Sequence, residues 1–348
     1  MKREIKYDFL RVLAIFGVIV IHVTSNSYNH ADVHSLSWSM ANIYNNLFRW
    51  TVPVFFMLSG ALLLNKEKII FKEFIKKYIL KNIGLFALFV ILYAVVEIGS
   101  VGAIFGSEKW NFIFLLFNYK YHLWFLVAII GLYMLYPIFL ALKQYENGKY
   151  IGYYCILFFI FSVLYHTLQT INFQGVLVYI STIFSNFNYE LVGYSGYFLT
   201  GYYLSKMDCS KNKVQLFIAL ILVFIVTIYI SYNYAITYGE INPKYSHYFF
   251  ISTYLEAIII FLIFNSIKFQ FGEKINRTIV EMSNLTVYVY LIHPFIMDCF
   301  FRYYPLEMIK IKTELIFIVI SILIFILCFA SAFLIKIGYQ KLKQLNKK

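Results

Sequence analysis

Residues 7–23 read YDFLRVLAIFGVIVIHV, an apolar run interrupted near its two ends by Arg11 and His22. A run of about 20 apolar residues is long enough to cross a bilayer as an α-helix. The eleven residues from Arg11 to His22 turn such a helix through about 1100°, which leaves the two side chains about 20° apart and about 16 Å apart along the axis. We therefore expect both side chains on one face of the first membrane-spanning helix.

Asp8 stands three residues before Arg11, near the same face, where the two side chains can pair. Ionisable groups within a span are costly and usually face the interior of the helix bundle or a water-filled cavity. Two interpretations remain open. Asp8 and Arg11 are interfacial anchors and His22 is a hydrogen-bonded core residue, or the three side chains form a functional column. The polar residues 24–26 that follow favour the column.

The composition indicates an all-α protein that crosses the membrane many times. Hydrophobic residues make up 61% of the 348 residues and charged residues 14%, whereas soluble domains are about one-quarter charged. No segment is long and polar enough for a separate soluble domain, so residues 1–348 are expected to form a single integral membrane domain. About ten spans are predicted, at residues 7–24, 44–64, 83–105, 121–141, 150–170, 189–206, 214–236, 247–266, 283–300 and 314–336.

The distribution of lysine and arginine predicts the orientation of these spans. With the N-terminus in the cytoplasm, the inner loops and tails hold 23 of the 30 basic residues, as the positive-inside rule requires. Both termini are therefore expected to be cytoplasmic, with the first helix retained rather than cleaved as a signal peptide. The net charge of +13 lies in short loops between apolar runs, which fits a membrane protein surrounded by lipid and argues against a nucleic-acid partner.

Two connecting segments look structured. Residues 65–82, NKEKIIFKEFIKKYILKN, place apolar side chains at helical spacing among lysines, which predicts a basic amphipathic helix on the inner surface. Residues 171–188 are polar and aromatic and are expected to form a re-entrant or interfacial outer element. No internal repeat is visible, so the repeat symmetry of many transporters is unsupported.

Further candidate residues follow along the chain. Arg49 near the outer end of the second predicted span is either an interfacial anchor or an anion clamp. Pro53 is expected to bend or end a helical turn, and Ser59-Gly60 to allow close helix packing.

Later segments add aromatic residues and histidines. Tyr121 and Trp124 fit an aromatic belt at the membrane surface, whereas His122 and His293 are equally compatible with structural and functional roles. Four acids lie in or near spans, and the sequence does not say which of them act in function: Glu97, Glu190, Glu256 and Asp298. The four cysteines show neither disulfide nor metal spacing, so no metal is expected.

Taken in order, these motifs resemble the integral membrane acyltransferase-3 family, and in particular its short members without an appended extracellular domain. The resemblance rests on the first helix, VPVFFMLSG at 52–60, the basic segment before the third span, YHLWFL at 121–126 and YLIHPF at 290–295. Its most specific part is HVTSNSYN followed by WSMANIYNNLFRWTVPVFFMLSG. The sequence departs from many members in using Lys76, Lys77 and Lys81 where they carry arginines, and lysine cannot grip a phosphate bidentately.

This resemblance implies transfer of an acyl group, usually acetyl, from cytosolic acyl-CoA to a hydroxyl of an extracytoplasmic cell-envelope glycan or lipid-linked oligosaccharide. A bacterial inner or plasma membrane is the expected location. Arg11 and the three lysines are the expected contacts of the anionic donor, since the basic inner surface offers it counter-charge.

We assign His22 as the general base, because an imidazole titrates near neutral pH. Asp8 and Arg49 complete the expected catalytic set, with Arg49 stabilising the oxyanion. Four further residues are expected in substrate binding or support: Tyr121, His122, Trp124 and His293.

A covalent acyl-histidine relay remains possible on this reading. The main rival function is a transporter or flippase for a lipid-linked saccharide or small metabolite, and the second is a non-catalytic membrane module that senses or assembles envelope polymers. The acceptor, the choice of acetyl or succinyl donor and the oligomeric state are left open.

Overall fold

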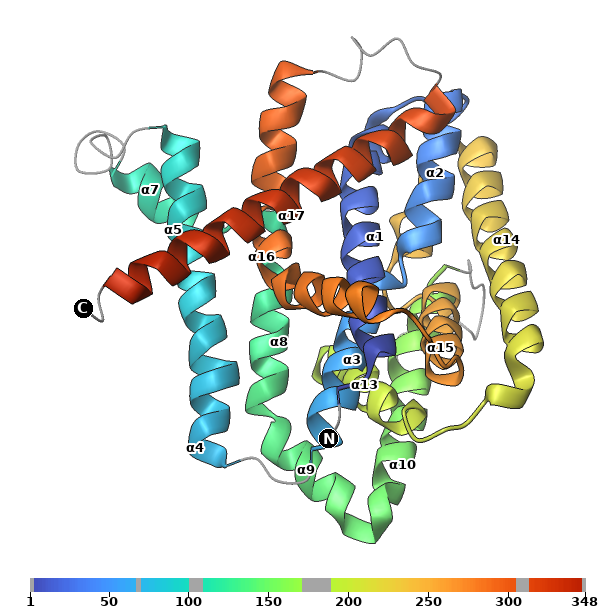
Figure 1. Cartoon of the computed structure of the whole chain (residues 1–348). Helices are drawn as coiled ribbons and strands as arrows, with labels where there is room; N and C mark the ends of the chain where they lie inside the picture. The colour runs from blue at the N-terminus through green and yellow to red at the C-terminus, as the bar shows by residue number, and fades with distance from the viewer. Residues whose placement is uncertain (1–2, 67–69, 100–108, 171–188, 305–312, 346–348) are drawn as a thin grey trace. The chain divides into compact units, whose positions relative to one another are not determined.

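The computed structural model describes residues 3–66, 70–99, 109–170, 189–304 and 313–345 (Figure 1). Every regular element in those ranges is a helix, and none is a strand. The chain divides into two compact units, residues Leu64–Asn147 and the remainder, and each is described by itself. The expected all-α polytopic membrane fold is confirmed.

The larger unit holds the first helices and the whole second half of the chain. Its helices of nine or more residues, with their bounds, are α1 (Ile5–His30), α2 (Leu36–Phe48), α3 (Thr51–Leu64), α10 (Lys149–Phe158), α13 (Tyr189–Leu204), α14 (Lys213–Tyr238), α15 (Ile251–Ser266), α16 (Glu273–Tyr303) and α17 (Thr313–Leu345). Short pieces connect some of them: η4 (Phe159–Leu164), α11 (Tyr165–Leu168), η5 (Ser210–Asn212) and η6 (Pro243–Ser246).

Helix α1 runs through the middle of this unit, and its closest neighbours are α2, α16 and α17 (Figure 1). Most of its side chains are buried, including Leu10, Ala14, Ile15, Ile19 and Val20, each with no exposed surface. A helix that is apolar almost all round is expected at the centre of a bundle. The predicted first span is therefore a central helix, and any polar side chain on it lies among neighbouring helices.

Hydrogen bonds of Asn265 join three helix ends of the larger unit. The Lys6 Nζ donates to Asn265 Oδ1 over 3.0 Å, and Asn265 Nδ2 donates to the Met207 carbonyl over 2.7 Å. These bonds join the start of α1, the turn between α13 and α14, and the end of α15. This is the end that the lysine distribution predicts to be cytoplasmic.

Helices α3 and α13 cross at glycines. A Cβ atom on Gly60 would lie 1.7 Å from the Phe198 carbonyl oxygen, and one on Gly201 would lie 2.0 Å from the Met57 carbonyl oxygen. Only glycine permits backbones to approach this closely. The prediction that Gly60 allows close helix packing is confirmed.

The smaller unit contains α4 (Phe71–Phe74), η1 (Ile75–Leu80), α5 (Lys81–Ile98), α7 (Lys109–Phe117), η2 (Tyr121–Leu123), α8 (Trp124–Met134), α9 (Tyr136–Gln144) and η3 (Tyr145–Gly148). The first three form one helical segment, which passes through a π-helical stretch and reaches Ile98 without a break. The basic segment is helical as predicted, but it is the beginning of the third span rather than a separate surface helix.

Nine helical segments of the described residues are long and apolar enough to cross a membrane. The predicted span without a counterpart among these nine is the sixth, residues 189–206, where α13 has only 16 residues and a non-helical turn at Gly193. The second span begins at Leu36, eight residues earlier than predicted. The predicted outer element at 171–188 lies outside the described residues.

Candidate active site between α1 and α16

Helices α1 and α16 lie side by side and bring polar residues together at two levels. Asp8 meets Ser283, and further along both helices His22 meets His293. Because the contacts occur in the same order along both helices, α1 and α16 run parallel here. The column predicted on α1 therefore has a counterpart on α16.

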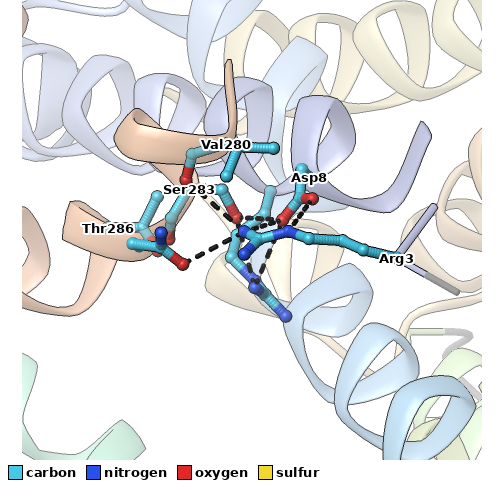
Figure 2. Close-up of polar contacts among 7 residues, drawn as sticks. Arg3, Asp8, Val280, Ser283 and Thr286 are labelled. Carbon is cyan, nitrogen blue, oxygen red and sulfur yellow. Dashed lines mark hydrogen bonds and ion pairs between the residues drawn. The ribbon is translucent and has the colours of Figure 1, made fainter. Parts of the chain in front are cut away.

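The first level is an ionic cluster around the Asp8 carboxylate, which is only 5% exposed. Arg3 Nε donates to Asp8 Oδ2 over 2.6 Å and Arg3 Nη2 donates to Oδ1 over 2.8 Å, while Ser283 Oγ donates to Oδ1 over 2.6 Å. Figure 2 shows the Arg3 guanidinium between Asp8 and the α16 residues Val280 and Ser283. Such a two-point contact between arginine and carboxylate is strong and directional.

Arg11 belongs to the same cluster but binds Asp8 less closely. Its Nη1 donates to Ser283 Oγ over 3.2 Å and lies 4.0 Å from Asp8 Oδ1. The hydrogen bond to Asp8 raises the pKa of Arg3 above its ordinary value, and an arginine side chain in a protein is always charged. Two cations share one carboxylate, and the cluster keeps a net positive charge that suits an anion. Sequence reasoning paired Asp8 with Arg11 and missed Arg3, its closer partner.

The second level is a pair of histidines. The ring centroids of His22 and His293 lie 5.1 Å apart with the ring planes inclined by 33°. His293 is fully buried, whereas His22 retains some exposed surface. His22 is therefore the member of the pair that a substrate can reach, and His293 lies behind it.

Pro294 determines how His293 is held. Proline has no N–H group, so the Tyr290 carbonyl loses its usual helical partner four residues later. The His293 Nδ1 lies 2.7 Å from that carbonyl oxygen and must carry the proton that it shares with it. In the neutral ring Nε2 is then the basic nitrogen. The sequence pair His-Pro thus fixes an imidazole tautomer inside a membrane helix.

The face of α1 between the two levels is covered. Ile15 and Val18 point in nearly the same direction as Arg11 and His22, and they are 0% and 4% exposed. Buried apolar side chains therefore separate the two polar levels along this face of α1.

Arg49 lies further from the start of its candidate span than predicted. Helix α2 ends at Phe48 and α3 begins at Thr51, so Arg49 occupies a break inside the candidate span Leu36–Leu64, thirteen residues from its start. Irregular backbone at membrane depth occurs where it is buried in protein or lines a polar cavity. The span predicted at 44–64 placed Arg49 near its outer end, whereas the candidate span of the structure also includes residues 36–43 and has Arg49 in its interior.

The side chains around Arg49 come from α15 and the turn before it. The Tyr248 hydroxyl and the Arg49 guanidinium form a hydrogen bond. The Glu256 carboxyl interacts electrostatically with the same guanidinium. Glu256 is completely buried, and its Oε1 accepts a 3.1 Å hydrogen bond from Thr227 of α14. Its Oε2 has no hydrogen-bond partner in the part of the chain that the structure describes.

Three asparagines of α2 extend this polar region and were not singled out from the sequence. Asn42, Asn45 and Asn46 have no exposed surface. Asn42 Oδ1 accepts hydrogen bonds of 2.7 Å from Ser231 of α14 and from Asn46. Their spacing of three and four residues, which places them on one helical face, is the signal that could have revealed them.

The remaining predicted residues belong to the smaller unit. Lys76, Lys77 and Lys81 are exposed on the helix that begins at Phe71, and Tyr121 is also exposed. Trp124 is partly buried.

His122 is 2% exposed, with its ring 5.1 Å from that of Tyr93. The aromatic-belt reading suits Tyr121 and Trp124. His122 packs inside its unit.

A buried ionic cluster, a histidine pair and a charged break inside one span are features of a membrane protein that handles a polar substrate within its helix bundle. Comparison with known sequences defines the class: the sequence model of the acyltransferase-3 family, described as an acyltransferase domain, matches residues 4–336. The chain belongs to this family and is a multi-pass membrane acyltransferase that acts on hydroxyl groups. No curated protein and no solved structure matches the chain.

Proposed function

We propose that the protein transfers an acetyl group from cytosolic acetyl-CoA to a hydroxyl of a cell-envelope glycan, or of its lipid-linked precursor, on the outer side of a bacterial plasma membrane. The observation that carries the proposal is the contact between the accessible His22 and the buried His293 on two parallel helices. The family membership supplies the reaction class, and the histidine pair supplies a base at membrane depth.

In the proposed reaction His22 removes the proton of the acceptor hydroxyl. The hydroxyl oxygen forms a bond to the thioester carbonyl carbon, the carbon–sulfur bond breaks, and the proton passes from His22 to the leaving thiolate. General-base catalysis of this kind contributes about 10²- to 10⁴-fold to a rate. His293, fixed by the Tyr290 carbonyl, orients the His22 ring.

Arg49 is assigned to the negative charge that develops on the carbonyl oxygen. Its guanidinium lies in a helix break inside the candidate span Leu36–Leu64, where it is partly buried and hydrogen-bonded to Tyr248. A preorganised donor in such a place stabilises an oxyanion better than one in bulk water.

The donor phosphates are assigned to Arg11. A donor contact of the exposed Lys76, Lys77 and Lys81, which belong to the smaller unit, stays a prediction from the sequence. The ionic cluster has a positive charge in excess of the single Asp8 carboxylate. On this proposal Asp8 contributes by holding Arg3 and Arg11 in place, without contacting the transferred group.

The test is transfer of label in isolated membranes. Membranes containing the protein are incubated with acetyl-CoA labelled in the acetyl group and with cell-envelope glycan extracts. Label should move to the glycan in the wild type, and transfer should fall at least a hundredfold in His22→Gln. The matched control is His34→Gln, which changes a histidine in the turn before α2 and should leave transfer unchanged.

Two results would overturn the proposal. Full label transfer by His22→Gln would exclude His22 as the base. Movement of an unacetylated saccharide across the membrane without any consumption of acetyl-CoA would favour a transporter instead.

A further inference from the structure

A polar cavity lies apart from the histidine pair, at the end of the larger unit where α1 begins. Its volume is about 860 Å³. Three segments far apart in sequence line it: residues 4–6, residues 205–213 and residues 265–269. Hydrogen bonds of Asn265 to Lys6 and to the Met207 carbonyl hold these segments together.

The charge of the lining is predominantly positive. Four lysines face two carboxylates, which leaves a net charge of +2: Lys6, Lys206, Lys213 and Lys268 against Glu4 and Asp208. Lys6 is neutralised, because its Nζ lies 2.7 Å from Glu4 Oε2. Lys268 lies close enough to Asp208 to lower the pKa of that carboxyl, although the backbone N–H of Ser210 contributes more to this shift.

Lys206 and Lys213 carry the excess charge. Neither is paired with a carboxylate among the described residues. Lys213 is also the first residue of the 26-residue helix α14, whose N-cap Asn212 makes no side-chain capping bond. The N–H groups at such a helix start add to the attraction for an anion.

The cavity is separate from the ionic cluster of the proposed active site. Lys6 and Arg11 are five residues apart on α1, which places them about 140° apart around the helix. An anion bound among the lysines would therefore lie on another side of α1 from the Arg11–His22 face.

The apolar residues that line the cavity indicate that its ligand has an apolar part as well as an anionic one. Ile5, Met207, Ile267 and Phe269 line the same cavity as the lysines, and Met207 is 42% exposed. A phosphate attached to an apolar body satisfies both kinds of surface. Basic pockets at helix ends on the cytoplasmic side of membrane proteins bind anionic headgroups for this reason.

We infer that this cavity binds a phosphate-bearing ligand, with Lys206 and Lys213 as the phosphate contacts. An anionic phospholipid of the adjacent leaflet supplies this chemistry together with the apolar body. The phosphorylated adenosine end of the acyl donor supplies the phosphate alone. Binding is measured without acyl transfer, so the inference stands or falls independently of the proposed function.

The test uses full-length protein, purified in detergent and stripped of lipid. The probes are dioleoylphosphatidylglycerol, zwitterionic dioleoylphosphatidylcholine and adenosine 3′,5′-bisphosphate, and the readouts are the thermal midpoint and the bound mass in native mass spectrometry. The variant is Lys206→Gln/Lys213→Gln. The matched control is Lys274→Gln/Lys341→Gln, which removes the same charge from exposed positions outside the cavity.

The expected result is that phosphatidylglycerol binds wild type and control alike and binds the cavity variant about thirtyfold more weakly, with no effect of phosphatidylcholine. Lysine-dependent binding of the bisphosphate alone would also support the phosphate site and identify a nucleotide as its source. Equal binding of every probe to the cavity variant and to wild type would overturn the inference. Should the double variant not fold, Lys213→Gln alone gives the same comparison with a smaller change.

Discussion

The two polar levels of the α1–α16 interface differ in how their atoms are used. At the ionic cluster, the Asp8 carboxylate is engaged on both oxygens by Arg3 and Ser283, and little of it remains exposed. At the histidine pair, the rings of His22 and His293 contact each other, and His22 keeps exposed surface. The polar atoms of the ionic cluster are thus occupied by hydrogen bonds within the cluster. The histidine pair, by contrast, has the partly exposed ring of His22 available to a substrate.

This difference separates stability from chemistry. Removing one partner of a buried, hydrogen-bonded charge leaves the other uncompensated and destabilises a protein strongly. Removing a ring that acts on substrate lowers activity and leaves most of the packing intact. Substitutions at the two levels should therefore have opposite signatures.

The largest effect is expected for the histidines in combination. His22→Ala should lower the rate of acyl transfer by about 10²- to 10⁴-fold, and His293→Ala should lower it less, because His293 acts through His22. If the two rings act as a unit, the double variant should be no slower than His22→Ala alone. Initial rates of label transfer and the thermal midpoint of each purified variant measure both halves of the prediction.

Fully additive losses in that double-mutant cycle would show that the rings act independently. A large fall in the thermal midpoint of His22→Ala would place this level with the ionic cluster and remove the contrast between the two.

Asp8→Ala should mainly reduce stability. It deletes two bonds to Arg3 and one to Ser283, and the expected loss is about 2–3 kcal/mol, below the range for fully buried pairs because Arg3 is half exposed. The measurement is the thermal midpoint in detergent. Arg277→Gln breaks an exposed pair with Glu273 and is the control, with an expected change below about 1 kcal/mol.

An Asp8→Ala protein that melts like wild type and has lost its activity would contradict this assignment and place Asp8 in the chemistry.

The sequence predicts those parts of this interface that depend on the spacing of residues within one helix, and it does not predict contacts between distant segments. Arg11 and His22 were found because helical geometry places residues eleven apart on one face. The motif YLIHPF at 290–295 drew attention to His293. Its contact with His22 joins residues that are far apart in sequence, and helical periodicity carries no information on such contacts. Arg3 was missed because it precedes the helix and reaches Asp8 by a long, flexible side chain.

The position of Arg49 was misjudged for a different physical reason. Residues 36–46 contain serines and asparagines that argue against a membrane span on composition alone. The structure buries Asn42 and Asn46 against each other and against Ser231 of α14, which removes much of the cost of placing them in the bundle. A hydropathy pattern cannot anticipate partners that a distant helix supplies.

A smaller effect is expected at Arg11, which contacts Ser283 at 3.2 Å and is less engaged than Arg3. Arg11→Gln should raise the KM for acetyl-CoA about tenfold, as expected for the loss of one charged contact to phosphate. The value of kcat should change little, because the contact is the same in the ground state and the transition state. Arg11→Lys keeps the charge but loses the planar donor fork, so its KM should lie between those of the wild type and Arg11→Gln.

Steady-state kinetics at saturating glycan separate the two parameters. A lower kcat with an unchanged KM in Arg11→Gln would place Arg11 with the histidines and contradict its assignment to the donor.

The smallest effect is expected at Pro294. It should lower kcat without lowering stability, which is the opposite of the result expected for Asp8 in the ionic cluster. Pro294→Ala restores an N–H that can donate to the Tyr290 carbonyl and compete with His293 Nδ1, which lies 2.7 Å from that oxygen. We expect kcat to fall by about three- to tenfold, the equivalent of about 0.7–1.4 kcal/mol, because His293 loses its fixed tautomer. Stability should stay equal or rise, since proline inside a helix costs up to about 3 kcal/mol. Pro294→Gly restores the same N–H but adds flexibility, so a similar fall in kcat in both variants attributes the effect to the hydrogen bond. An unchanged kcat in both would show that the proline serves the shape of α16 alone and that the orientation of His293 depends on other contacts.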